Sequence, residues 1–194
     1  MRRWLGAVLL GLLSVSWASS VSAAEAPVRI TVGSKSFTES VILGEMLGQL
    51  ARQAGAEAEH RQQLGGTRVL WNALLAGDID AYPEYTGTLF QEILREKPRT
   101  QAELGQALAA HALRMTSSLG FNNTYAIGVK EDLAQRLKLK TISDLKRHPE
   151  LVLGFTNEFM DRADGWPGLR QRYQLPQQDV RGLDHDLAYR GLAA

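Results

Sequence analysis

The stretch VRITVGSKSFTESVILGEMLGQLARQAGAEAEHRQQ, residues 28–63, decides the fold class. Its first residues alternate and are rich in β-branched side chains, which predicts a strand over Val28–Val32. After a short loop, Thr38 is an expected helix N-cap, and apolar residues then recur at helical spacing to about Gln53. A second, polar strand is expected over Glu57–Gln63. A strand, a helix and a strand in succession are typical of a parallel sheet with helices on its faces.

The same alternation of strands and helices continues along the rest of the chain. A turn at Leu64–Thr67 opens a helix that Gly77 closes, and Ile79–Ala81 is expected to form a short strand. The later elements predicted by pattern are helices at Thr88–Leu94, Glu103–Met115, Asp132–Leu137, Ser143–Arg147 and Asp164–Tyr173, strands at Leu151–Phe155 and Val180–Leu183, an extended segment at Leu119–Val129, and a final helix capped by Asp184. The predicted fold class is therefore α/β.

The first 24 residues have the features of a secretory signal peptide. Arg2 and Arg3 form a positive start, Leu5–Val15 is apolar, and small residues ending at Ala23 supply a cleavage site. The apolar run is shorter than the roughly 20 residues that a membrane span needs. We therefore expect an exported, periplasmic protein that is soluble after cleavage of residues 1–24.

Composition and motifs give no support for catalysis, a metal site or nucleic-acid binding. The chain has no cysteine, four histidines without metal-ligand spacing, and a formal net charge of +1 without a basic run. No nucleophile-elbow or phosphate-loop motif is present. Asp78, Asp80 and Glu84 are candidates for an acid pair, but such residues at a strand end are more often turn formers or hydrogen-bond acceptors. We expect neither an enzyme nor a cofactor.

Three tyrosines, Tyr82, Tyr85 and Tyr125, stand where predicted strands pass into loops. In open α/β sheets, ligands bind outside the carboxyl ends of the strands. An aromatic face attracts a quaternary ammonium ion by about 0.5–2 kcal/mol. The residues alone leave two interpretations open: the rings complete the edge of a core, or they line a cation-binding site.

Several sequence blocks occur in a characteristic order. They are GSKSFTES (33–40), LGGT (64–67), GDIDAYPEYTGT (77–88), LGFNNTYAIGV (119–129), TISDL (141–145), GFTNEFMDRADGWPGL (154–169) and DHDLAYRGLAA (184–194). Together these blocks closely resemble the substrate-binding proteins of ABC transporters for glycine betaine, choline, carnitine and related osmoprotectants. The resemblance covers essentially the whole chain after residue 24, and its specificity comes from the joint order of the blocks.

The resemblance implies a type II periplasmic-binding-protein fold, in which two α/β lobes with parallel or mixed sheets close around a solute. The first lobe would take residues 25–123, and the second would take residues 124–194. In the family, the chain finally returns to the first lobe. Because no such return precedes Ala194, we expect a chain that is truncated at its C-terminus.

The resemblance also implies which residues surround the ligand's cationic end. The tyrosines of PEYTGT and NNTYA, here Tyr85 and Tyr125, line the cage around the trimethylammonium group. Asn123 is expected to offer a backbone carbonyl near the cation. Trp166 is expected in a core rather than in the ligand wall.

For the anionic end, the resemblance assigns Lys35 and Thr88 from one lobe and Arg162 from the other. A guanidinium and an ammonium group suit a carboxylate because they form charge-assisted hydrogen bonds. Together they favour a carboxylate-bearing ligand over choline. Alternative roles are a surface charge for Lys35 and a structural ion pair of Arg162 with Asp161 or Asp164.

The function that the resemblance implies is non-catalytic. The protein would capture glycine betaine or a related quaternary ammonium solute outside the cytoplasm and deliver it to an ABC permease, as a monomer without a cofactor. Two alternatives stay open: a ligand-sensing domain of the same fold, and a binder of choline, carnitine or an amino-acid betaine. The signal peptide and the lack of a helix-turn-helix pattern argue against a DNA-binding regulator.

Overall fold

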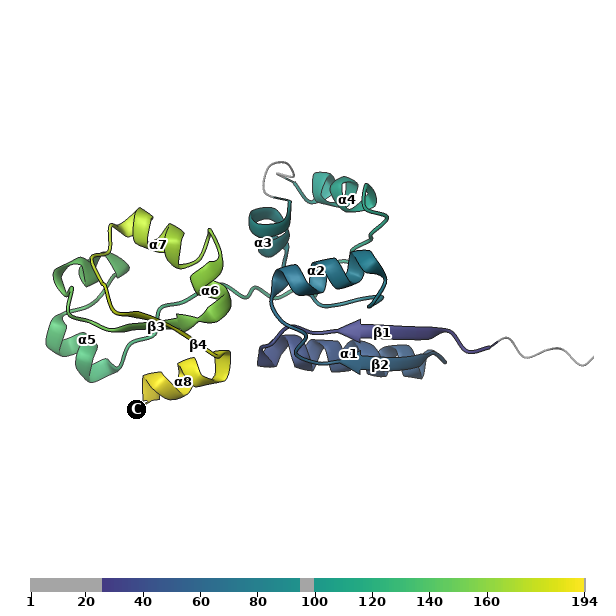
Figure 1. Cartoon of the computed structure of the whole chain (residues 1–194), viewed down its shortest axis with the longest axis horizontal. Helices are drawn as coiled ribbons and strands as arrows, with labels where there is room; N and C mark the ends of the chain where they lie inside the picture. The colour runs from purple at the N-terminus through teal and green to yellow at the C-terminus, as the bar shows by residue number, and fades with distance from the viewer. Residues whose placement is uncertain (1–25, 95–99, 194) are drawn as a thin grey trace, which may run out of the picture.

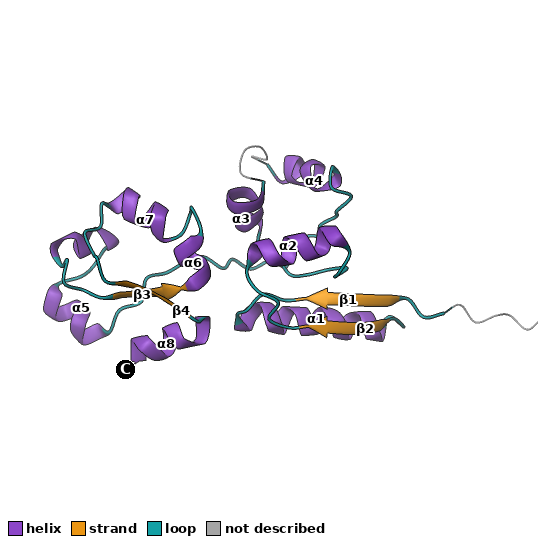
Figure 2. Ribbon diagram, viewed as in Figure 1, coloured by secondary structure: helices purple, strands orange, loops and turns teal. Residues whose placement is uncertain are grey.

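The computed structural model describes residues 26–94 and 100–193, and its helices and strands form two groups (Figure 1). Each group is built on its own two-stranded parallel sheet, with helices packed around it (Figure 2). The predicted α/β class is confirmed. The signal peptide expected at residues 1–24 lies outside the described residues.

The N-terminal group follows the predicted order of elements. It consists of β1 (Arg29–Gly33), α1 (Thr38–Gln53), β2 (Glu57–Arg61), α2 (Thr67–Ala76), α3 (Thr86–Thr88), the π-helical segment η1 (Leu89–Ile93) and α4 (Gln101–Ala109). The strand expected at Ile79–Ala81 is wrong in extent, because only a single parallel bridge joins Ala81 to Val32. Two residues later, Pro83 has no N–H to donate, so the ladder does not continue.

The start of α1 differs from the prediction by one position. Phe37 has an extended backbone and stands at the N-cap without a side-chain hydrogen bond, so Thr38 is the first helical residue. The expected capping role of Thr38 is therefore wrong. Its hydroxyl instead donates to Asp186 Oδ1 at 3.1 Å, which is a contact between the two groups.

The face that α1 buries is made of small residues. Gly44 lies so close to β2 that a Cβ at this position would come within 2.5 Å of His60 Nε2. Ser40 and Gly48 are also buried. The larger apolar residues that mark the helix in the sequence are more than half exposed: Ile42, Met46 and Leu50.

The C-terminal group repeats the strand-and-helix plan. It consists of α5 (Glu131–Leu137), the 3-10 helix η2 (Ile142–Arg147), β3 (Leu153–Thr156), α6 (Asn157–Asp161), α7 (Trp166–Tyr173), β4 (Val180–Leu183) and α8 (His185–Ala193). The predicted bounds of β4 are confirmed, and Asp184 Oδ1 accepts from the N–H of Asp186 at the start of α8, as a cap does. The pattern missed α6. It also placed the start of α7 too early, because Gly165 has a non-helical backbone.

Each group has its own hydrophobic core. The N-terminal core contains Trp71, Leu89, Leu104 and Leu108. The C-terminal core contains Leu145, Phe159, Trp166 and Leu175, which confirms that Trp166 is a core residue.

The segment that links the groups was predicted to be extended, and residues 121–130 belong to neither a helix nor a strand. In Figure 1 it crosses from one group to the other. Across the described ranges, no helix has both the length and the apolar character that a membrane crossing requires.

Candidate functional site

The site begins at the carboxyl end of β1, where Lys35 is only 2% exposed. The Lys35 N–H donates to Ser40 Oγ at 2.9 Å, which ties the loop to α1. The ammonium group donates to Thr67 Oγ1 at 2.9 Å and to Glu84 Oε1 at 2.7 Å. The alternative of a surface charge is therefore wrong: Lys35 is a buried cation paired with a buried carboxylate, since the Glu84 side chain is 8% exposed.

Thr67 connects this buried pair to the other group of elements. It is the first residue of α2, directly after the Leu64–Thr67 turn. Both its N–H and its hydroxyl donate to Glu158 Oε1 of α6, at 3.2 and 2.5 Å. A carboxylate at this place is favourable because the N–H groups at a helix start lack partners and the helix dipole is positive there.

Arg162 follows α6 and is 7% exposed. Its Nε and Nη2 donate to the two carboxylate oxygens of Asp164 at 2.8 and 2.6 Å, so the alternative of a structural pair with Asp164 is confirmed. Its Nη1 donates to Thr88 Oγ1 at 3.2 Å and lies 3.7 Å from Glu158 Oε1.

The pKa of Arg162 reflects two opposing effects. Burial lowers it, but the hydrogen bonds with Asp164 and the negative charges nearby outweigh burial, so the pKa of Arg162 is raised and the group stays charged. Thr88 and Arg162, assigned to opposite lobes by the resemblance, are thus in direct contact.

Tyr85 and Asn123 meet at one carboxylate. The Tyr85 hydroxyl and the Asn123 side-chain amide both donate to Glu39 Oε1, the amide at 3.0 Å. Lys35 Nζ lies 5.7 Å from the centre of the Tyr85 ring. Burial, together with the hydrogen bond to Glu39, raises the pKa of Tyr85, so its hydroxyl remains a donor at neutral pH.

Tyr125 is the most exposed of the aromatic candidates, with 57% of its surface accessible. Its ring packs edge-on against Phe159, with 4.7 Å between centroids, and Arg162 Cζ lies 6.0 Å from the ring centre. Tyr82 is different: its buried hydroxyl has no hydrogen-bond partner among the described residues. Burial, together with the nearby Glu84 carboxylate, raises the pKa of Tyr82, so Tyr82 lies beside the carboxylate that pairs with Lys35.

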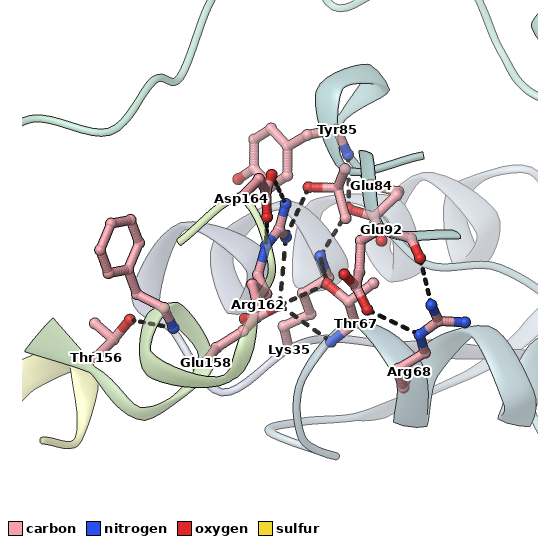
Figure 3. A network of polar contacts seen from close by, with 12 residues as sticks. Lys35, Thr67, Arg68, Glu84, Tyr85, Glu92, Thr156, Glu158, Arg162 and Asp164 are labelled. Carbon is pink, nitrogen blue, oxygen red and sulfur yellow. Dashed lines mark hydrogen bonds and ion pairs between the residues drawn. The ribbon is translucent and has the colours of Figure 1, made fainter. Parts of the chain in front are cut away.

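Figure 3 shows the central part of this network of polar contacts. At its edge, Arg68 Nε donates to Glu92 Oε1 at 3.0 Å. Contacts with shared partners join the candidate residues predicted from the sequence: Lys35, Tyr85, Thr88, Asn123, Tyr125 and Arg162. Sequence reasoning missed two of the carboxylates that hold them, Glu39 and Glu158, and considered Glu84 and Asp164 only in other roles, as an acid-pair candidate and as a structural partner of Arg162. One signal was available, because Glu158 precedes Arg162 by four residues, a spacing that allows an ion pair on a helix.

Two of the three acidic residues considered as a catalytic pair, Asp80 and Glu84, have separate structural partners. Asp80 Oδ2 accepts from the N–H of Thr31 at 2.6 Å, and Glu84 Oε1 accepts from Lys35 and from the N–H of Tyr85 at 2.8 Å. Within residues 26–94 and 100–193, histidines and carboxylates form no cluster suited to a metal ion. The arrangement therefore offers aromatic faces and fixed charges, which are the elements of non-covalent recognition.

Comparison with known proteins adds a family to this geometry. Residues 28–193 match the family OpuAC, described as the substrate binding domain of ABC-type glycine betaine transport systems. The chain is 30% identical to the glycine betaine-binding protein YehZ of Escherichia coli (strain K12), over 94% of this chain and 63% of that protein. It is 32% identical to the ergothioneine transport permease/ergothioneine binding protein EgtU of Helicobacter pylori (strain G27), over 83% of this chain and 30% of that protein.

A solved structure is similar to this chain in fold and in sequence. The crystal structure of a glycine betaine/carnitine/choline ABC transporter superimposes with a TM-score of 0.58 at 28% identity, covering 86% of this chain and 65% of that one. The chain therefore spans less than two thirds of the length of these relatives.

Proposed function

The chain belongs to the family of substrate-binding domains of ABC-type glycine betaine transport systems, and from this we propose that it captures a quaternary ammonium solute for an ABC permease. Glycine betaine or a close relative of it is the proposed ligand. The observation that carries the proposal is the convergence of two tyrosine rings and two buried cations, Lys35 and Arg162, in one network of contacts.

The proposed roles follow from the two unlike ends of a betaine. Tyr85 and Tyr125 would face the methylated cation, which cannot donate hydrogen bonds and is attracted by the ring quadrupoles. Lys35, Thr88 and Arg162 would serve the carboxylate. In the structure Asn123 donates to Glu39 through its side chain, so its proposed contact with the cation through a backbone carbonyl requires no change of that hydrogen bond.

We propose that the two groups of elements are the two lobes of a type II binding protein, residues 25–123 and 124–194. Two separate parallel sheets and two separate cores support this division. A ligand held by Tyr85 on one side and Arg162 on the other binds the closed arrangement better than the open one, and so shifts the population toward closure. The permease would recognise the closed form.

Membership of a family of ABC-transport substrate-binding domains supports a location outside the cytoplasm. We propose export into a periplasm through the segment 1–24, which the sequence marks as a signal peptide. The proposed working unit is a monomer that meets its permease only to deliver the solute.

Calorimetry on the full-length protein with glycine betaine, choline, carnitine and proline betaine tests the proposal. Arg162→Ala should weaken glycine betaine binding about 10- to 100-fold more than choline binding, because only glycine betaine has a carboxylate for the guanidinium. Arg181→Ala, which removes an exposed arginine of β4, is the matched control and should change neither affinity. Equal losses for both solutes would remove Arg162 from the carboxylate role.

A further inference from the structure

Glu158 is one of the side chains through which the two groups of elements meet. Its Oε1 accepts from the N–H and the hydroxyl of Thr67, at 3.2 and 2.5 Å. The Thr67 hydroxyl oxygen in turn accepts from Lys35 Nζ at 2.9 Å, and Arg162 Nη1 lies 3.7 Å from the same Glu158 oxygen. A single carboxylate oxygen of Glu158 thus accepts from the N–H and the hydroxyl of Thr67 at a helix start and has a guanidinium nearby. The Lys35 ammonium group reaches it indirectly, through its hydrogen bond to the Thr67 hydroxyl.

These surroundings are the ones that a ligand's carboxylate requires. Two donors of one residue at a helix N-terminus, with a guanidinium at 3.7 Å and an ammonium group hydrogen-bonded to the same threonine, form a receptor for an anion. Lys35 and Arg162 are 2% and 7% exposed, so the receptor is largely removed from water. Its occupant in this structure is Glu158, a residue of the protein itself, which reaches it from α6.

We propose that Glu158 occupies the position of the ligand's carboxylate and thereby determines selectivity between solutes with and without a carboxylate. The inference rests on the proposed function. A carboxylate-bearing solute has to displace Glu158 from Thr67 before it binds, whereas a solute without a carboxylate, such as choline, leaves Glu158 in place.

The position of Glu158 makes such an exchange feasible. Its side chain is 29% exposed, so the displaced carboxylate has access to water. Arg162 keeps its bidentate partner Asp164, and Lys35 keeps its partner Glu84, when Glu158 leaves. The exchange therefore swaps one anion for another without leaving either buried cation unpaired.

The first test asks whether the receptor accepts an external carboxylate, and it needs no quaternary ammonium compound. Thermal melting of Glu158→Ala is compared in sodium acetate and in sodium chloride at equal ionic strength. At acetate concentrations well above its dissociation constant, we expect the melting temperature to rise by about 3 °C relative to chloride.

Three proteins serve as controls for this melting experiment. The wild type and Glu158→Gln keep the receptor filled, and Glu150→Ala removes an exposed carboxylate of the same group of elements. None of the three should respond to acetate more than to chloride. If Glu158→Ala responds no more than these controls, the receptor does not exist.

The second test measures the ratio of the dissociation constants for glycine betaine and choline on the full chain. Glu158→Ala should shift this ratio about tenfold in favour of glycine betaine binding. If the substitution also weakens closure of the two groups, the affinities for both solutes fall together and this effect cancels in the ratio. Glu158→Gln, which preserves volume and one acceptor, should shift it about threefold in the same direction and serves if the alanine variant does not fold.

The outcomes are distinguishable. A ratio that is unchanged, or that moves toward choline, overturns the selectivity role of Glu158 while leaving solute binding intact. If no quaternary ammonium solute binds the wild type or the variants, the proposed function and the selectivity role both fail, and the acetate response alone decides whether the carboxylate receptor exists.

Discussion

Tyr85 is held at both its backbone and its hydroxyl by a carboxylate. Its N–H donates to Glu84 at 2.8 Å, and its hydroxyl donates to Glu39 of α1. The ring centre lies 6.1 Å from that of Phe37 and 5.7 Å from Lys35 Nζ. The ring is therefore oriented before any solute arrives, which lowers the ordering cost of binding.

At the scale of this residue, Tyr85→Ala should weaken binding of glycine betaine by about 1–3 kcal/mol, because it removes packing and cation–π attraction together. Tyr125→Ala should have an effect in the same range. Tyr85→Phe is the matched control and should cost much less, since it keeps the ring face. Calorimetry decides the matter: a phenylalanine variant as weak as the alanine variant would assign the interaction to the hydroxyl.

The sequence singled out candidate site residues, but it did not reveal most of the side chains that they contact in the structure. Lys35 and Arg162 were identified because they lie in blocks that resemble the binding-protein family. The pair of Arg162 with Asp164 was among the alternatives considered, but the pair of Lys35 with Glu84 could not be predicted in the same way. Glu84 reaches Lys35 across 49 positions of the chain, and such a contact depends on how the elements pack rather than on any local pattern.

The junction between α6 and α7 shows how one glycine sets the distance between two elements. Gly165 is buried, and a Cβ added there would lie 2.0 Å from the carbonyl oxygen of Phe159. Since that neighbour is backbone, it cannot turn aside as a flexible side chain would. The close approach in turn positions Arg162, which lies between the two helices.

Gly165→Ala should lower the free energy of unfolding by about 1–3 kcal/mol or more, because the chain has to move to relieve the clash. Gly105→Ala in α4 is the matched control, since a Cβ there meets nothing within 4 Å. It should raise the free energy of unfolding by about 0.5–1 kcal/mol through helix propensity. Urea denaturation measures both, and similar values for the two variants would contradict the packing argument.

The start of η2 carries a pH-dependent contribution to stability. Asp144 Oδ2 accepts from the N–H groups of Lys140 and Thr141 at 2.9 and 2.8 Å, and Arg147 lies 2.8 Å from its other oxygen. The pKa of Asp144 lies well below its usual range. The backbone hydrogen bonds are the main cause, and the side chains of Thr141 and Arg147 contribute less. The folded protein therefore favours the ionised form.

Because the pKa of Asp144 is lower in the folded than in the unfolded chain, its contribution is complete above the unfolded value of about 3.9 and is lost as the pH falls toward the folded value. Asp144→Asn should therefore lose less stability between pH 5 and pH 2 than the wild type does. Melting temperatures across this range test the expectation, with Asp132→Asn of α5 as a control that should follow the wild type. Parallel curves for Asp144→Asn and the wild type would refute it.

Local signals explain which elements were predictable. The strand Val180–Leu183 was found with its observed bounds, and Asp184 after it was recognised as the cap of the next helix. The short helix α6 was missed because its five residues are too few for an apolar period to emerge. A threonine at its N-cap, whose Oγ1 accepts from the N–H of Phe159, was one local cue.

At the scale of the whole molecule, two hydrophobic cores are joined by polar contacts. Leu104 and Leu175, fully or almost fully buried, belong to different cores. Thr67–Glu158, Thr88–Arg162 and Thr38–Asp186 link the two groups through hydrogen bonds. Such links are weaker and more readily rearranged than a shared apolar core.

Leu104→Ala and Leu175→Ala should each destabilise mainly the group that contains the residue, by about 2–5 kcal/mol. In native-state hydrogen exchange, Leu104→Ala should speed exchange in α2 and α4, and Leu175→Ala should speed exchange in β3 and β4. Each variant is the control for the other. Equal acceleration in both groups would mean that the chain unfolds as one cooperative unit.

The division into two groups was predicted near residue 123, but the contacts between them were not. Thr67 and Glu158 are 91 positions apart, and neither lies in a pattern that points to the other. Assignment of the groups as lobes 25–123 and 124–194 remains a prediction. What the sequence could not supply is the relative placement of distant elements, because that depends on the sum of many weak tertiary contacts.

The small buried face of α1 has a practical meaning for anyone altering this helix. Gly44 and Gly48 face inward while Ile42 and Met46 face outward, so the hydrophobicity of a side chain is a misleading guide to which positions tolerate substitution. In a saturation library scored for folding, alanine at Gly44 would be depleted sooner than glutamate at Met46. The close packing of α1 depends on the absence of large side chains on its inner face, and its large apolar side chains on the outer face are the ones free to vary.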